Sequence, residues 1–280
     1  AASCGAAALD FGKSGDALKK LDVDKVVDAG KRLVESTQMM PEDQEIALGR
    51  DLAARLLGAM PPLDAPAVQA FVNRLGLWLA LQTDRPDLPW QFVVTDSDSV
   101  GAFATPGGNV IITAGLLRLM RDEHELAGVL AHEIHHVVER HHLEAIMANA
   151  RMALAKDLAA DVAKSYVGNP AVSEALLNAG VELYTAGLDQ ADEFDADRRG
   201  TVTATAGGYD PAGLLLLLTT LDSISADEPR LALLTSTHPP TRERIDRLAG
   251  TVEAMDVDPP TTLMDSGRFA TMQAGLFAAD

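Results

Sequence analysis

A run of five residues, His132-Glu133-Ile134-His135-His136, carries the clearest chemical signal in this sequence. Successive residues of an α-helix turn by roughly 100°, so His132 and His136 would lie on one face, one turn apart. Two imidazoles at that spacing can hold one zinc ion, and Glu133 beside them can reach a water molecule on that ion. The spacing therefore predicts a zinc hydrolase, although the same pattern also occurs by chance in helices that bind nothing.

Four more histidines lie nearby in the sequence, and we expect none of them to bind the zinc. His135, three residues after His132, could compete as a ligand. A site built from those two histidines would leave Glu133 without the histidine pair beside which it is expected to act. His141 falls roughly 180° around the helix from His132, so we expect it, together with His142, to be a surface or supporting residue. His124 is expected on the surface of the first helical turn.

A catalytic zinc site needs a third protein ligand and an open position for water. The third ligand should come from another segment, and Glu193 and Asp197 stand four residues apart on one face of a helix predicted over 188–206. With Glu193 as the ligand, Asp197 can accept the free ring N–H of a zinc histidine, for which His132 is the best candidate. The alternative is that Glu193 belongs to a solvated acidic face, because several aspartates surround it.

The segment before the motif predicts the helix that positions it. Asp122 is a good N-cap, and Glu125 three residues later makes an acidic capping box. Apolar residues then recur at helical spacing through the motif, namely Leu126, Val129, Leu130, Ile134, Val137 and Val138.

The other segments are mainly helical, with a small sheet just before the motif. Residues 90–95 and 110–113 are rich in β-forming types and predict two strands, whereas 96–106 between them is turn-like. The Ala-rich segment 144–188 predicts two helices that either act as a lid or simply pack.

The chain divides into an N-terminal tether and arm helix, 1–40, and one compact domain, 41–280, whose last residues 256–280 form a weakly patterned tail. With 47% apolar residues over 280 positions, the chain can bury a full core. Its longest apolar run, Leu214 to Leu218, is far too short to cross a bilayer, so we expect no transmembrane span. The net charge of -18 argues against nucleic acid and anionic lipid as partners.

The single cysteine, Cys4, follows three small residues, Ala1-Ala2-Ser3. Small residues before a cysteine resemble the end of a bacterial lipoprotein signal, in which the cysteine is acylated. This interpretation places the protein in the periplasm, tethered to the outer membrane by a lipid anchor. The alternative is an incidental thiol, which would also allow a cytoplasmic location.

Several motifs occur in a fixed order: Asp43–Ile46, Gly101–Gly108, Val110–Thr113, Gly115–Leu117, Glu125–Ala131, H-E-x-x-H, Glu193–Asp197, Gly208–Pro211 and Thr237–Pro239. In this order and spacing the chain resembles the CAAX-prenyl-protease/HtpX-like family of gluzincin zinc metallopeptidases. Within that family it most resembles the soluble bacterial envelope branch (BepA- and LoiP-like). The resemblance covers about residues 41 to 250.

The resemblance implies an α+β, mainly helical fold: a zincin-like metallopeptidase domain with a small β-sheet packed on the H-E-x-x-H helix. It implies one Zn²⁺ per chain, held by His132, His136 and Glu193. Glu133 would be the catalytic base, and Asp197 would support a ligand from behind.

Three further positions are compared with the same family. His238 falls in the family's His-Pro turn, where its imidazole either stabilises an oxyanion or occupies the water position, and Arg244 is expected to help the same site. Gly101 stands where the family usually has Asn, which puts a side-chain contact to substrate at that point in doubt.

The resemblance implies a zinc-dependent endopeptidase that hydrolyses internal peptide bonds of unfolded or misassembled cell-envelope proteins. Water activated by the metal would attack, with Glu133 as general base, and the strand 110–113 would pair with an extended substrate backbone. The alternative is a mainly non-proteolytic chaperone or assembly factor for outer-membrane proteins with a latent zinc site. The sequence gives no indication of the oligomeric state.

Overall fold

The structure of the chain, a computed structural model, describes residues 40–153, 169–224, 228–238, 241–255, 257 and 267–277. The predicted lipid anchor at Cys4 and nearly all of the predicted arm 1–40 lie outside these residues. So do the middle of the predicted lid and much of the predicted tail.

Three short strands form the sheet that precedes the zinc motif. The strands are β1 (Gln91–Thr95), β2 (Ala102–Thr105) and β3 (Asn109–Thr113). Their order is β1-β3-β2, with β1 parallel and β2 antiparallel to the central strand β3. The prediction of a turn over 96–106 is therefore wrong at β2. All four residues of β2 are buried, so its sequence lacks the alternation that marks a half-exposed strand.

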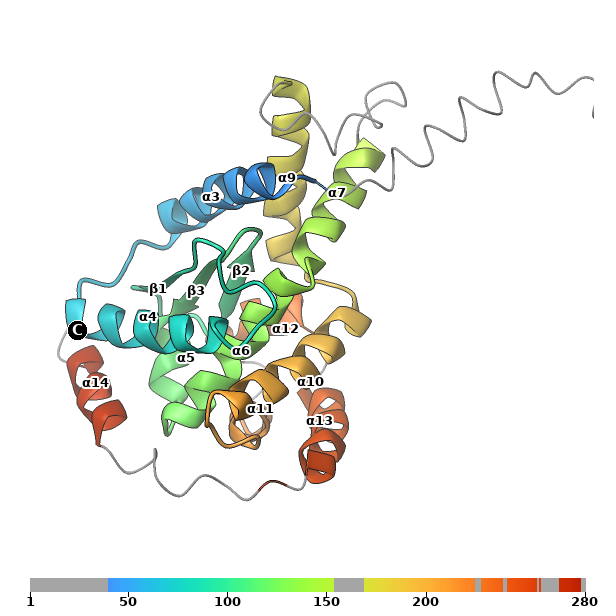
Figure 1. The fold of residues 1–280 in the computed structure, drawn as a ribbon. Helices are drawn as coiled ribbons and strands as arrows, with labels where there is room; N and C mark the ends of the chain where they lie inside the picture. The colour runs from blue at the N-terminus through green and yellow to red at the C-terminus, as the bar shows by residue number, and fades with distance from the viewer. Residues whose placement is uncertain are drawn as a thin grey trace, which may run out of the picture.

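The H-E-x-x-H motif lies on α6 (Glu123–Val138), which is buried from Glu123 to Val137. Besides α7 (His141–Ala153), which follows it in the chain, its neighbours are β2 and β3 and the helices α4, α10 and α11 (Figure 1). These helices span Pro66–Ala80, Gln190–Ala206 and Gly213–Asp222. The predicted fold, mainly helical with a small sheet against the motif helix, is confirmed.

The start of α6 is capped by a variant of the predicted capping box. Asp122 accepts from the backbone N–H groups of His124 and Glu125, at 2.9 and 3.0 Å. The side chain of Glu125 does not return to Asp122 but accepts from the backbone N–H of Arg121, at 2.8 Å. The expectation that His124 lies on the surface is wrong, because its ring is buried and its Nδ1 accepts the backbone N–H of Asp210 at 2.7 Å.

Three helices form a second, smaller core beside the sheet: α3 (Glu42–Ala59), α7 (His141–Ala153) and α9 (Pro170–Ala186). Helices α7 and α9 pack along each other, and α3 packs on α9 (Figure 1). Leu48, Ile146 and Leu176, one from each helix, are fully buried in this core. Helices α7 and α9 are the described parts of the predicted lid, and that role stays a prediction.

The last described segment, within the predicted C-terminal tail 256–280, is a helix. Helix α14 (Arg268–Phe277) packs on α4 and on α5 (Ala114–Leu119). Phe269, Met272 and Leu276 are its buried residues, and three apolar positions in so short a helix give only a weak periodic signal. The remaining elements are a 3-10 turn (Pro229–Leu231), α12 (Ala232–Thr237) and α13 (Thr241–Met255). None of the helices in the described ranges is both long and apolar enough to span a membrane.

Candidate metal centre

Three side chains from two packed helices converge on one buried point. His132 and His136 extend from α6, and Glu193 extends from α10. The Nε2 atoms of the two rings are 3.0 Å apart. The carboxylate oxygens of Glu193 lie 3.5 Å from Nε2 of His136 and 3.7 Å from Nε2 of His132.

A glycine allows the two helices to approach closely enough for this geometry. A Cβ atom added to Gly200 of α10 would lie only 2.8 Å from the backbone nitrogen of His132 on α6. Any larger residue would therefore separate the helices. Gly200 thus helps to place Glu193, two turns earlier on α10, against the histidine pair.

The donor set fits a zinc ion. The donor atoms of His132, His136 and Glu193 all lie within 4.8 Å of one another. Oxygen Oε2 of Glu193 is buried and has no hydrogen-bond partner among the described residues. Burial lowers the pKa of both histidines, which favours the neutral rings whose lone pairs can bind metal. Two histidines and one glutamate are a ligand set typical of catalytic zinc sites.

Asp197 lies behind His132, on the side away from Glu193. Its Oδ1 is 2.9 Å from Nδ1 of His132, and its two oxygens accept from Arg244 at 2.9 and 2.6 Å. Burial would raise the pKa of Asp197, but the charge and hydrogen bonds of Arg244 together with His132 hold it below its ordinary value. An ionised Asp197 favours a proton on Nδ1 of His132, which leaves Nε2 as the metal donor.

Arg244 belongs to this group but reaches it through Asp197. The guanidinium is buried, and its Nη1 lies 4.0 Å from Oε2 of Glu193. The structure therefore brings Arg244 to the site, as a partner of the carboxylates.

His141 lies behind the other histidine, His136. Its Nδ1 is 3.2 Å from Nδ1 of His136, and its Nε2 is 3.9 Å from Oδ1 of Asp192. The predicted position on the far side of a continuous helix is wrong, because α6 ends at Val138 and the chain turns at Arg140 with a φ of 61°. The turn places the ring of His141 against the ring of His136, and His141 is buried.

Glu133, the predicted base, is buried beside the two histidines. It is 3% exposed and borders both cavities that flank the histidines, of about 20 and 30 Å³. Burial raises the pKa of Glu133 to about 8, although the charge of Arg244 opposes this rise. Glu133 also forms, with His132 and His238, a second group whose donor atoms lie within 4.8 Å of one another.

His238 approaches the metal group from α12. Its Nε2 lies 3.7 Å from Oε2 of Glu193, and its Nδ1 is 2.9 Å from Oγ1 of Thr237. At this distance its ring can serve either of the two predicted roles, a donor to an oxyanion or an occupant of the water position.

The remaining histidines of the region do not join the described metal groups. Nε2 of His135 points to α10, 2.7 Å from Oγ1 of Thr203. The ring of His142 stacks on Tyr184 of α9, with 5.4 Å between ring centroids. Tyr184 is a site residue that the sequence analysis missed, because no motif marks it. Its hydroxyl donates to the carbonyl of Ala104 in β2, at 2.8 Å.

The expectation that the strand 110–113 pairs with substrate is wrong. Strand β3 is central and is already paired on both edges, by β1 and β2. The two edge strands are β1 and β2. It is β2 whose residues Ala102 and Phe103 border the cavity beside Glu133 and His136. If any strand of this sheet pairs with substrate, it is β2.

The fold and the site together define a class of protein: a zincin-like metallopeptidase, in which a helix with H-E-x-x-H meets a glutamate from a later helix. Residues 66–252 match the model of Peptidase family M48. The chain belongs to this family.

Named relatives agree with this assignment. The chain is 29% identical over 245 residues to the beta-barrel assembly-enhancing protease of Yersinia pestis, covering 85% of this chain and 50% of the relative. It is 30% identical over 209 residues to the protein of that name from Escherichia coli (strain K12), covering 72% and 42%. It is 29% identical over 178 residues to the mitochondrial metalloendopeptidase OMA1 of Schizosaccharomyces pombe, covering 64% and 51%. The chain thus spans about half the length of these relatives.

Proposed function

We propose that this protein is a zinc-dependent endopeptidase that cleaves internal peptide bonds of unfolded or misassembled envelope proteins. The observation that carries the proposal is the convergence of His132, His136 and Glu193 on one buried point with Glu133 beside them. A structural zinc site would be expected to close with four protein ligands and would not need a base.

The roles of the chain's own residues follow from the geometry. When bound by the two histidines and Glu193, zinc supplies Lewis acidity toward water and a peptide carbonyl. Glu133 takes the proton from the attacking water and later donates it to the leaving amine. Asp197 holds the proton on Nδ1 of His132, and the buried Arg244 keeps Asp197 ionised.

The class of substrate is proposed from the relatives and from the sheet. Relatives named beta-barrel assembly-enhancing proteases suggest polypeptide substrates of the bacterial envelope. Pairing with the edge strand β2 would accept many sequences, because it uses backbone groups. Tyr184 now binds the carbonyl of Ala104 in β2, so pairing there would require α9 to release this carbonyl, which is how the predicted lid would act. We place the protein in the periplasm, with Cys4 as its lipid anchor.

The test is cleavage of an unfolded protein, such as casein, by the wild type and by Glu133→Gln. The variant is expected to bind zinc as the wild type does and to cleave roughly 10²-fold to 10⁴-fold more slowly, the usual contribution of a general base. If the zinc-loaded wild type cleaves nothing, yet wild type and variant equally prevent aggregation of an unfolded barrel protein, the chaperone function is correct instead.

A further inference from the structure

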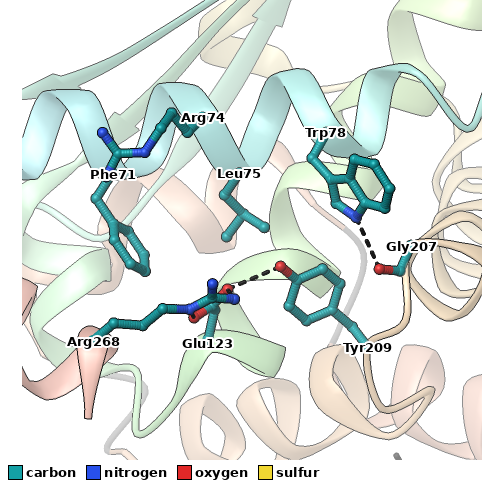
Figure 2. A pocket seen from close by; sticks show the side chains of 8 residues that line it. All are labelled: Phe71, Arg74, Leu75, Trp78, Glu123, Gly207, Tyr209 and Arg268. Atoms are coloured by element: carbon teal, nitrogen blue, oxygen red, sulfur yellow. Dashed lines mark hydrogen bonds and ion pairs between the residues drawn. The ribbon is translucent and has the colours of Figure 1, made fainter. Parts of the chain in front are cut away.

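A cavity of about 380 Å³ lies under α4, away from the metal centre. Helix α4, the first residue of α6, the turn after α10 and the start of α14 enclose it. Figure 2 shows Phe71, Leu75 and Trp78 along α4, opposite Arg268 and Glu123. None of its lining residues borders the two cavities beside the zinc ligands.

The floor of this cavity is a fixed row of polar groups. Glu123, which is buried, accepts from Nε of Arg268 at 2.6 Å and from the hydroxyl of Tyr209 at 2.8 Å. The charge of Glu123 is therefore satisfied within the protein, and this carboxylate does not need a ligand. The row joins α14 to the start of the zinc helix.

The roof is apolar and partly uncovered. Trp78 is 49% exposed, although its indole N–H is held by the carbonyl of Gly207 at 2.8 Å. Leu77 on the same helix and Leu81, which follows its last residue, are 39% and 62% exposed. Neither residue lines the cavity, so exposed apolar side chains continue along α4 beyond it. Exposed apolar side chains beside polar groups are typical of a protein-binding site.

The unpaired charge at this site is positive. Arg74 lines the cavity, and within the described part of the chain its guanidinium forms no ion pair or hydrogen bond. A guanidinium can bind a carboxylate with two hydrogen bonds, so an unpaired arginine at this site favours a ligand that carries a carboxylate.

We propose that this cavity binds an acidic, amphipathic polypeptide segment. The segment inserts one large apolar side chain beside Trp78 and places a carboxylate against Arg74, while Leu77 and Leu81 cover its remaining apolar face. An aromatic side chain fits both the volume and the aromatic walls. The site does not depend on the proposed peptidase activity, because it shares no residue with the metal centre.

The test measures binding of a fluorescein-labelled peptide of about ten residues, with Leu and Phe at helical spacing and Asp elsewhere. The protein is the full chain carrying Glu133→Gln, so that no cleavage can interfere, and anisotropy is recorded at low salt. We expect saturable binding that Arg74→Gln and Trp78→Ser each weaken about tenfold or more. Arg55→Glu, a charge change at an exposed arginine on α3 outside the cavity, should leave binding unchanged.

Two matched peptides complete the design, one with Asp replaced by Asn and one with Phe replaced by Ser. Both should bind more weakly than the parent peptide. The proposal would be overturned if all three peptides bound equally. It would also be overturned if the protein with Arg74→Gln bound the parent peptide as tightly as the protein with Arg74. A dimer in sedimentation that Trp78→Ser dissociates would overturn it too, because the occupant would then be a second copy of the chain. Circular dichroism of each variant verifies that these exposed substitutions leave the fold intact.

Discussion

The two histidines of the candidate metal site are supported by different chemical groups. A carboxylate, Asp197, lies behind His132, whereas a second imidazole, His141, lies behind His136. If His136 binds metal through Nε2, its Nδ1 carries the proton and must donate it. The acceptor is Nδ1 of His141, whose own proton is then on Nε2, on the side of Asp192. This arrangement fixes the orientation of His136 without adding a charge beside the metal.

The role of His141 predicts the order of two substitutions. His141→Leu removes the acceptor and should weaken zinc binding roughly 10-fold to 100-fold, the usual effect of losing such a partner. His141→Gln keeps an acceptor oxygen and should lose less. The measurement is competition for zinc with a chelator of known affinity. Equal affinities for wild type and the leucine variant would show that the contact is only packing.

His135 should make the stability of the protein depend on pH. Burial, and after it the charge of Arg199, lowers the pKa of His135 to about 4, whereas an unfolded histidine titrates near 6.5. Between pH 6.5 and pH 4 the unfolded chain binds a proton at His135 more readily than the folded chain does. The free energy of unfolding is therefore highest above pH 6.5, as far as His135 is concerned, and falls as the pH falls toward 4. The loss is at most roughly 3 kcal/mol in the free energy of unfolding.

This dependence is measured by urea unfolding at pH 7.5 and pH 5, with a chelator present so that zinc contributes nothing. The free energy of unfolding should fall less between the two pH values in His135→Gln than in the wild type. Other buried histidines titrate in both proteins and cancel in the comparison. An identical fall would mean that His135 is not held neutral by the fold.

At the scale of elements, the site depends on the distance between α6 and α10. In Gly200→Ala, the new methyl group would overlap the backbone of His132. We expect α10 to shift, zinc affinity to fall and the free energy of unfolding to drop by about 1–3 kcal/mol. Gly250→Ala on α13 is the matched control, because a Cβ there meets nothing within 4 Å. It should stabilise the protein by up to about 1 kcal/mol. If both variants bind zinc normally, helix separation does not set the site.

The sequence predicted the elements whose signal is local and missed those set by tertiary contacts. The N-cap at Asp122 and the apolar stripe of α6 act within the helix, so they could be predicted. Strand β2 could not, because full burial removes its alternation. The turn at Arg140 could not be predicted either, because a left-handed φ at an arginine has no sequence signal. That turn alone decides that His141 lies behind His136.

For the whole molecule, the spacing of H-E-x-x-H and of Glu193–Asp197 predicted which residues could meet, and the structure brings them together. What lies around them depends on the complete chain. The contact of Tyr184 with β2 and the cavity under α4 join segments distant in sequence, and no periodic pattern encodes such contacts. At the cavity under α4, Arg268 of α14 binds Glu123, the first residue of α6.

The metal centre should also contribute to the stability of the whole fold. Without metal, the protein buries the carboxylate of Glu193 with its Oε2 unpartnered among the described residues, and burial raises its pKa to about 8. Burying such a group costs free energy. A metal ion that binds only the folded state stabilises that state by mass action, by about 2.7 kcal/mol at a concentration of 100 Kd.

Thermal unfolding with and without zinc distinguishes a residue that binds the metal from a residue that acts as a base. The wild type in saturating zinc should unfold roughly 5–10 °C above the protein in chelator, given the usual change of about 2–4 °C per kcal/mol at this size. Glu133→Gln should keep this shift, because the base takes a proton and holds no metal. Glu193→Gln should lose most of it, and magnesium should not replace zinc, because nitrogen ligands bind magnesium poorly. A full zinc shift in Glu193→Gln would show that the third ligand lies elsewhere, and His238 in the second group with His132 and Glu133 would then be the residue to examine.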